Sequence, residues 1–382
     1  MSVLNPVRLG MVGGGQGGFI GSIHRTASRM DGKYVLCAGA FSSDPLKSKE
    51  SGRELGLDED RIYETYGELL DGEIKRNDGI EAVSIVTPNN MHFPIARRFL
   101  EAGIHVICDK PFTLEVKEAD VLIELAREKN LLLAVTYNYS GYPMIKQARA
   151  MIKSGDLGKI RVIQAEYAQG WLSEAIEQDG HKQASWRTDP KQSGISGCVG
   201  DIGTHAYHLM SYTSGLTPTS LCATLSTFVK GRQLDDDANI LLRFEGGATG
   251  SIWVSQIAVG QDNGLRLRIF GEKGGVEWSQ ENPNELVFSP LGGNPERLTG
   301  GSSALHSEAT TITRLPPGHP EGYIEAFANL YSEIASTITA LRDSKHHRIK
   351  ADHPSGEDGR EGVNFIHSVV RSNLTGSTWI DL

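Results

Sequence analysis

The sequence has few cysteines, no basic excess and no long apolar run, and each shortage excludes a class of protein. Four scattered cysteines without C-x-x-C spacing indicate free thiols in a reducing compartment, not a disulfide framework or a zinc site. Lysine and arginine number 38 against 47 acidic residues, a formal net charge of −9, which argues against broad nucleic-acid binding. No uncharged apolar run approaches the ~20 residues that a bilayer span requires.

The N-terminal MSVLNPVRLG lacks a basic region followed by an apolar one, so it indicates no secretory signal. We therefore expect a cytoplasmic protein with no membrane and no nucleic-acid partner. The 382 residues, 39% hydrophobic and 22% charged, are typical of a globular chain long enough for two domains.

Glycine is abundant, with 44 residues, and its informative cluster lies near the N-terminus. Residues 7–12 predict a buried strand and residues 19–23 the start of a helix. Between them, Gly13, Gly15 and Gly18 have the G-x-G-x-x-G spacing of a dinucleotide-binding turn. Residues without Cβ let the backbone approach a pyrophosphate, and the helix N-terminus presents N–H groups to it. An ordinary strand–helix turn is the alternative for this motif taken alone.

Strand-like and helix-like segments alternate through the first third of the chain. Further strand patterns lie at residues 34–41, 62–66, 82–86, 104–108 and 131–135. Apolar strands alternating with helices predict a parallel sheet covered on both faces, the doubly wound Rossmann fold. Ligands of this α/β fold bind beyond the carboxyl ends of the strands. We assign residues 1–136 to an NAD(P)-binding domain.

The pattern changes near residue 136, after which strand-like segments separated by Gly-rich turns dominate. These strand patterns lie at residues 160–169, 221–229, 238–244, 249–256, 265–270, 275–279 and 286–288. Such runs predict a mostly antiparallel sheet, so residues 137–382 form a second α/β domain in our prediction. Helical patterns at residues 144–153, 201–212, 322–341 and 358–374 accompany it.

Two polar segments come directly after predicted strands and would face the dinucleotide crevice. The first is Thr87-Pro88-Asn89-Asn90-Met91-His92, and the second is Asp109-Lys110-Pro111. Proline restricts the backbone of the residue before it, which fixes where the Lys110 side chain points. A positioned lysine supplies a cation near a substrate oxygen; a solvated loop lysine is the alternative.

A third polar place is the pair Asp201 and His205, which share one face of a helix at four-residue spacing. A carboxylate beside an imidazole fixes its tautomer and stabilises its protonated form. A helix cap and a buried core histidine are the alternative reading. With His208 the pair would give a carboxylate–imidazole metal site, but no further ligand motif accompanies them, so we predict no metal.

These motifs, in this order, resemble those of the Gfo/Idh/MocA oxidoreductases over nearly the whole chain. They read GGGQGG, TPNNMH, DKP and WRTDPKQSGISGCVGDIGTHAYHL. The resemblance implies a Rossmann domain and a substrate-binding and oligomerisation domain whose large open sheet forms a homodimer or homotetramer. It also implies NAD(P)-dependent oxidation of a secondary hydroxyl of a sugar, anhydrosugar or cyclitol. The longer forms GGGQGGFIGSIH, GAFSSDP, NYSGYP and WRTDP look most like a subgroup that includes L-glucose/scyllo-inositol and levoglucosan dehydrogenases.

The resemblance implies that Lys110, Asp201 and His205 are catalytic. We expect His205 to act as general base, Asp201 to orient it and Lys110 to favour the developing alkoxide. Asp109 stands where the family usually has glutamate, which affects how Lys110 is held. The expected cofactor-binding residues are Gly13, Gly14, Gly15, Gln16, Gly17, Gly18, Phe19, Ser42, Ser43, Lys47, Thr87, Pro88, Asn89, His92, Asp109, Lys110 and Asn138. The expected substrate-binding residues are Lys110, Tyr139, Tyr142, Gln169, Trp171, Trp186, Arg187, Asp201 and His205.

The end of the second strand pattern bears on the choice between NAD and NADP. Ser42 occupies the place of the acid that usually binds the ribose hydroxyls, with Asp44 two residues further on and Lys47 nearby. Serine and lysine suit a 2′-phosphate, whereas Asp44 would repel one. The matching subgroup leans to NAD, so we predict NAD, with NADP as the alternative. Two other functions stay open: glycoside elimination through a transient keto-sugar, and non-catalytic NAD(P) sensing.

Overall fold

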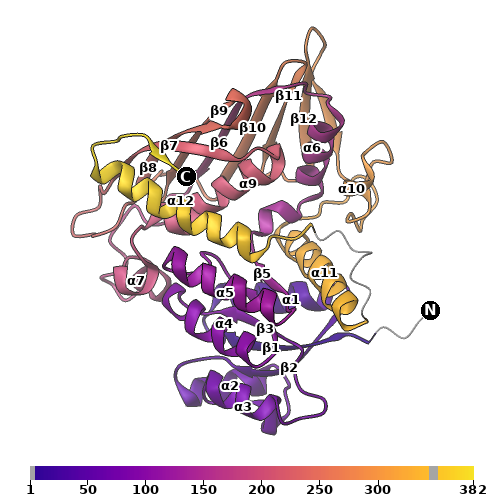
Figure 1. Cartoon of the computed structure of the whole chain (residues 1–382), viewed down its shortest axis with the longest axis vertical. Helices are drawn as coiled ribbons and strands as arrows, with labels where there is room; N and C mark the ends of the chain where they lie inside the picture. The colour runs from indigo at the N-terminus through magenta and orange to yellow at the C-terminus, as the bar shows by residue number, and fades with distance from the viewer. Residues whose placement is uncertain (1–4, 344–351) are drawn as a thin grey trace. The chain divides into compact units, whose positions relative to one another are not determined.

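The computed structural model describes residues 5–343 and 352–382, which form two compact units (Figure 1). The first unit comprises Met1–Asn138 with Phe327–Arg360, and the second comprises Tyr139–Ala326 with Glu361–Leu382. We predicted that all residues after 136 belong to the second domain, whereas the chain returns to the first unit from Phe327 to Arg360. Residues 1–4 and 344–351 of the predicted domains lie outside the described residues.

The first unit is built on a parallel five-stranded sheet in the order β2-β1-β3-β4-β5. Its strands are β1 (Val7–Gly13), β2 (Tyr34–Ala40), β3 (Ala82–Val86), β4 (His105–Cys108) and β5 (Leu133–Val135). The central strand β3 is buried along its whole length, as a sheet covered on both faces requires. The predicted strand at residues 62–66 is wrong, because Ile62 makes only an isolated bridge to Gly39.

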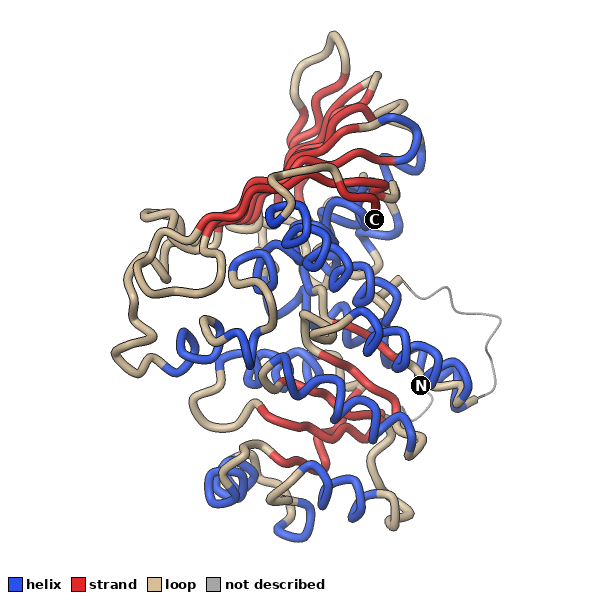
Figure 2. The backbone as a smooth tube through the Cα atoms, turned by 60° about the vertical axis from the view of Figure 1, so that its left-hand side comes forward, coloured by secondary structure: helices blue, strands red, loops and turns tan. Residues whose placement is uncertain are grey.

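Helices lie on both sides of this sheet (Figure 2). They are α1 (Phe19–Met30), α2 (Pro45–Glu54), α3 (Tyr66–Glu73), α4 (His92–Glu101) and α5 (Val116–Glu128), joined by part of α11 (Tyr323–Arg342). Local sequence explains where several begin: Asp44 caps α2 ahead of Pro45, and Glu115 with Glu118 forms a capping box at α5.

The strand order places the functional loops of the first unit at one edge. The chain moves outward from β1 in both directions, so the carboxyl ends of β1 and β3 flank the point at which the order reverses. A doubly wound sheet binds its ligand at such a point. The glycine loop, the segment after β3 and the segment after β4 all leave the sheet at this edge.

The second unit contains a nine-stranded sheet in the order β13-β12-β11-β10-β6-β9-β8-β7-β14. Its strands are β6 (Ile160–Ala168), β7 (Pro218–Ser226), β8 (Asp237–Phe244), β9 (Thr249–Ser255), β10 (Gly264–Gly271), β11 (Gly274–Ser279), β12 (Glu285–Pro290), β13 (Glu296–Thr299) and β14 (Ile380–Asp381). The strands β6 and β9 pair in parallel and the other neighbours are antiparallel. The predicted fold class, a Rossmann sheet plus a large, mostly antiparallel sheet, is confirmed.

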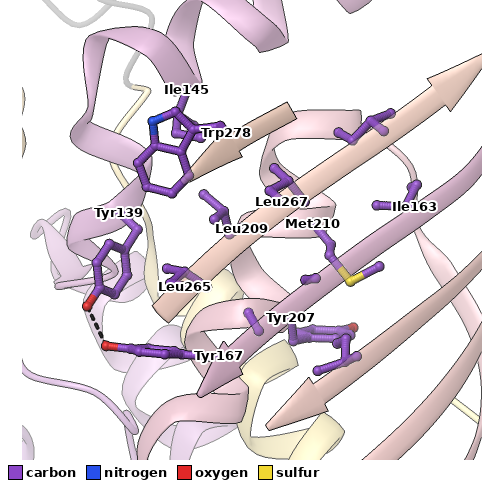
Figure 3. Packing of buried hydrophobic residues seen from close by; sticks show 14 of the residues in the cluster. Tyr139, Ile145, Ile163, Tyr167, Tyr207, Leu209, Met210, Leu265, Leu267 and Trp278 are labelled. Atoms are coloured by element: carbon purple, nitrogen blue, oxygen red, sulfur yellow. Dashed lines mark hydrogen bonds between the residues drawn. The ribbon is translucent and has the colours of Figure 1, made fainter. Parts of the chain in front are cut away.

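Helices cover one face of this sheet. Those that pack on it include α6 (Pro143–Ser154) and α9 (Thr204–Ser214), and the C-terminal part of α12 (Gly356–Leu374) adds Phe365 to the same core. Figure 3 shows side chains of α9, such as Leu209 and Met210, packed against Leu265 and Leu267 of β10. The opposite face carries a shallow cavity of about 380 Å³ lined by residues of the central strands, among them Leu241.

Short helices and turns complete the described chain. They are α7 (Lys182–Arg187), α8 (Pro190–Ser193), α10 (Ser307–Thr310), a π-helical turn (Val199–Gly203) and 3₁₀ turns at Glu59–Arg61, Asn89–Met91, Asn138–Gly141 and Glu245–Gly247. No helix among the described residues combines the length and the apolarity needed to cross a membrane.

Candidate active site

The glycine loop after β1 is shaped for a close backbone approach. Gly13 and Gly14 have φ values of +83° and +71°, which residues with a Cβ rarely adopt. A Cβ on Gly15 would lie 2.6 Å from Ser51 Oγ. One on Gly21 would lie 2.3 Å from the Gly14 Cα. Glycine at position 15 therefore lets the loop lie against Ser51 of α2, and glycine at position 21 lets α1 pack on the loop. The sequence reasoning missed Gly21; its signal was a glycine one turn into the helix.

The N-terminus of α1 faces this loop without a local cap. The N-cap residue is Gly18, which has no side chain that could cap the helix. The first N–H groups of a helix carry a partial positive charge that favours an anion. The loop is fixed from outside: Gly15 N donates to Phe41 O at 3.0 Å, and Gln16 N donates to Ser51 Oγ at 3.1 Å. This cradle fits a dinucleotide pyrophosphate.

The end of β2 shows how Asp44 is used. Its Oδ1 accepts from Leu46 N at 3.0 Å and from Lys47 N at 3.3 Å, while its own N–H donates to Ser42 Oγ at 3.1 Å. The carboxylate is therefore committed to capping α2 and still adds a negative charge beside Ser42 and Ser43. That charge favours a ribose with free hydroxyls over a ribose with a 2′-phosphate.

Asp109, at the end of β4, holds the loop that carries Lys110. Its Oδ1 accepts from the Lys110 backbone N–H at 2.8 Å and from Thr136 Oγ1 at 3.0 Å. The shorter acid thus bonds its own loop and the end of β5. Its Oδ2 lies 4.0 Å from Nε2 of the buried His24.

His24 belongs to a buried polar cluster on α1. Its Nδ1 lies 2.8 Å from the Tyr331 hydroxyl and 3.2 Å from Ser84 Oγ. Burial, partly opposed by the nearby charge of Asp109, lowers the pKa of His24 to about 4. The imidazole is therefore neutral at physiological pH, with Nδ1 within hydrogen-bond distance of both hydroxyls.

His92, predicted to contact the cofactor, ties two loops together. The ring is fully buried; Nδ1 lies 2.8 Å from Pro111 O, and Nε2 lies 3.0 Å from Thr87 O. Burial lowers the pKa of His92. The side chain thus links the segment after β3 to the segment after β4, and a direct cofactor contact stays a prediction.

Asn138 follows β5 and is buried together with its side-chain amide. The residue is 1% exposed, and neither Nδ2 nor Oδ1 has a hydrogen-bond partner among the described residues. A buried amide without a partner is costly. A ligand that both donates and accepts, such as a carboxamide, would satisfy both atoms.

Asp201 and His205 lie in the second unit on an interrupted helix. The predicted helix from residue 201 begins instead as the π-helical turn Val199–Gly203, which continues into α9. Such turns are frequent at functional sites. Oδ2 of Asp201 accepts from Arg187 Nε at 3.1 Å and from Gln256 Nε2 at 2.9 Å. The sequence reasoning identified Arg187 but missed Gln256.

Two tyrosine rings lie beside the buried His205. Its ring lies edge-on to Tyr139, with the centroids 4.8 Å apart. The Tyr139 hydroxyl bonds that of Tyr167 (Figure 3), which donates to Asn263 Oδ1 at 2.7 Å. Asn263, also missed from sequence, accepts from Gln169 as well.

The remaining predicted substrate residues divide into two groups. Trp171 donates to Gln169 Oε1 at 3.1 Å, and Arg187 lies over the rings of Trp171 and Trp186, 5.9 Å and 4.2 Å from their centroids. Arg187, which also bonds Asp201, connects the two tryptophans to that carboxylate. Tyr142 lies instead in the hydrophobic core, 5.3 Å from the Trp278 ring. Lys110 belongs to the first unit, so its convergence with His205 stays a prediction.

Comparison with known proteins agrees with the class that the fold defines. Residues 7–137 match a family described as "Oxidoreductase family, NAD-binding Rossmann fold", so the chain is an NAD-binding oxidoreductase. Residues 145–277 match the GFO/IDH/MocA C-terminal domain. The chain belongs to the Gfo/Idh/MocA family.

Several relatives match over almost their whole length. An uncharacterized oxidoreductase, YfiI, from Bacillus subtilis is 37% identical over 99% of this chain and 98% of its own. A levoglucosan dehydrogenase from Pseudarthrobacter phenanthrenivorans is 27% identical, with 98% of each chain covered. The crystal structure of an inositol dehydrogenase homolog from Azotobacter vinelandii, complexed with NADH and myo-inositol, is 39% identical with a TM-score of 0.93 and covers 99% and 98% of the two chains.

Proposed function

We propose that this protein oxidises a secondary hydroxyl of a neutral sugar, anhydrosugar or cyclitol with NAD. One observation carries the proposal: a buried imidazole, His205, follows a charged carboxylate, Asp201, whose position two donors fix. The relatives named for levoglucosan and inositol support a polyhydroxylated ring as substrate.

The bound nicotinamide supplies the hydride acceptor for this reaction. His205 removes the hydroxyl proton as general base, while the negative charge of Asp201 favours the imidazolium that forms. The Lys110 ammonium stabilises the alkoxide that develops as the proton leaves the hydroxyl oxygen. Asp109 restrains the Lys110 backbone through the 2.8 Å bond, which reduces the freedom of the cation.

The first unit would hold the cofactor with the residues described above. The glycine loop and the N-terminus of α1 bind the pyrophosphate, and Ser42 and Ser43 lie at the ribose end. Asn138 offers both an N–H and an oxygen to the carboxamide of the nicotinamide.

The second unit favours a neutral substrate. Arg187 pairs with Asp201 at 3.1 Å, so its charge is already balanced. Trp171 and Trp186 offer apolar ring faces, and Gln169 offers an amide; a polyhydroxylated ring uses both kinds of contact.

The test is NADH formation from a panel of cyclitols, aldoses and anhydrosugars. Lys110→Met and His205→Ala should each lower kcat by at least about 100-fold, whereas Lys117→Met and His319→Ala, which change exposed residues, should not. Near wild-type turnover in either of the first two variants would contradict the assignment. Release of a free sugar without NADH would indicate elimination chemistry, and NADH binding without turnover would indicate a sensor.

We also propose that the open face of the nine-stranded sheet joins copies of this chain into a homo-oligomer. This face presents Leu241, 54% exposed, beside the shallow cavity. Leu241→Glu should reduce the molar mass measured by light scattering. Val259→Glu, at an exposed position outside the strands, is the matched control; equal masses for the two variants would refute the interface.

A further inference from the structure

Three consecutive aspartates, Asp235, Asp236 and Asp237, precede and begin β8. The first two are buried, with exposed fractions of 8% and 2%. A buried carboxylate is costly unless hydrogen-bond donors surround it. Their partners therefore show which part of the fold these charges serve.

The Asp235 carboxylate gathers donors from one short segment far away in sequence. Its Oδ1 accepts from Ser196 Oγ at 2.7 Å and from Gly197 N at 2.8 Å. Its Oδ2 accepts from Val199 N at 3.0 Å and from Cys198 Sγ at 3.1 Å. Burial and the adjacent carboxylate raise the pKa of the Cys198 thiol well above its ordinary value, so the thiol keeps the proton that it donates.

The backbone reinforces these side-chain contacts. Cys198 N donates to Asp235 O at 2.9 Å, and a Cβ on Gly197 would lie 2.2 Å from that oxygen. Glycine is therefore required for the two segments to approach so closely. The aspartate and the segment 196–199 form one fixed contact.

This contact lies at the start of the π-helical turn that carries Asp201. The N-cap residue of this turn is Cys198, and in the described structure its side chain makes no capping hydrogen bond to the turn. Asp235 supplies the missing acceptor from the segment before β8, as an N-cap residue would, and places negative charge at the N-terminal end of the turn.

The next aspartate fixes the other side of Asp201. Gln256 N donates to Asp236 O at 2.9 Å, and the Gln256 side chain donates to Asp201 Oδ2 at 2.9 Å. The carboxylate of Asp236 accepts from Phe228 N and Val229 N. The backbone of Asp201 is thus set through Asp235, and its side chain is set through Gln256.

We infer that Asp235 is a positioning residue for the reaction, one that holds Asp201 and the following His205 in productive geometry. The inference rests on the proposed function. Without this carboxylate the turn can relax, and displacement of a catalytic group by about 1 Å can cost on the order of 100-fold in rate.

The test compares Asp235→Ala, Asp235→Asn and Asp237→Asn. Asp237 is adjacent in sequence, but its carboxylate accepts from Trp253 Nε1 at 3.1 Å, so its variant is the matched control. We measure kcat and KM for the polyol that the wild type oxidises, the pH profile of kcat, NADH binding and the thermal midpoint.

We expect Asp235→Ala to lower kcat about 100-fold with NADH affinity unchanged, because the cofactor residues lie in the other unit. Asparagine keeps an oxygen for Ser196 and Gly197, so Asp235→Asn should recover about tenfold of the loss. The pH profile should change in position as well as in height. If Asp235→Ala does not fold, Ser196→Ala removes one of the four bonds and should lower kcat severalfold.

The outcomes separate the two claims. Equal kcat for the Asp235 variants and Asp237→Asn, or a loss that follows only the folded fraction, overturns the positioning role while the proposed function stands. A wild type that binds NADH but oxidises no polyol overturns the proposed function, and the positioning role with it.

Discussion

Acid should destabilise the first unit through His24, and the size of the effect follows from its environment. The side chain is fully buried, and burial lowers its pKa from 6.5 to about 4. Between these two values the unfolded chain binds a proton that the folded chain does not. This contribution to stability is fully present above pH 6.5 and is lost as the pH falls toward 4.

The magnitude follows from the pKa difference. One pKa unit corresponds to about 1.4 kcal/mol, so at about pH 5 the proton taken up by the unfolded chain costs the folded state about 2 kcal/mol. At about pH 7 both states are neutral at this site and the cost is close to zero. Because the group is fully buried, solvent screening does not reduce this difference.

Urea unfolding at about pH 7 and about pH 5 measures the effect in wild type, His24→Gln and His319→Gln. For each protein, the free energy of unfolding at the lower pH is subtracted from that at the higher pH. This difference removes the pH-independent cost of losing the Tyr331 bond. The stability lost between the two pH values should be about 2 kcal/mol smaller in His24→Gln than in wild type. The exposed His319 control should match wild type. An equal loss in wild type and His24→Gln would refute this reasoning.

Three further predictions concern the cofactor unit. Gly15→Ala should weaken NADH binding at least tenfold, measured by fluorescence, because the new Cβ would lie 2.6 Å from Ser51 Oγ and 2.8 Å from Phe41 O; unchanged affinity would count against the cradle. Asp44→Ala should lower the free energy of unfolding by about 1 kcal/mol through the lost cap and should improve the kcat/KM ratio for NADP over NAD; a fall in that ratio would be contrary to the charge argument. Asn138→Leu should raise the KM for NAD about tenfold while stability holds or improves, because a buried amide without a partner is removed; a large loss of stability would show a structural role instead.

The parts of the fold predicted well from sequence are those with a local signal. Gly13 and Gly15 come at and just after the end of an apolar strand. The apolar run at residues 104–108 is short and lies between Gly103 and Asp109. Both signals depend on neighbours within a few residues. The strand predicted at residues 62–66 is wrong because a strand also needs a paired neighbour, which the local sequence does not reveal. Ile62 is apolar and buried, but among the described residues it forms an isolated bridge and no ladder.

The parts that sequence did not predict depend on contacts between distant segments. Asp235 caps a turn that begins 36 residues earlier in the chain, and Gln256 bonds an aspartate 55 residues away. Neither residue stands in a recognisable local motif. The π-helical turn at Asp201 was predicted as regular helix, because its sequence has helical spacing and the acceptor that caps it comes from elsewhere.

The most direct test is a structure of the protein with NAD and its polyol substrate bound. We predict that Lys110 Nζ and one ring nitrogen of His205 both lie within hydrogen-bond distance of the same hydroxyl oxygen. A complex in which only one of the two groups contacts the reacting hydroxyl, or neither does, would contradict it.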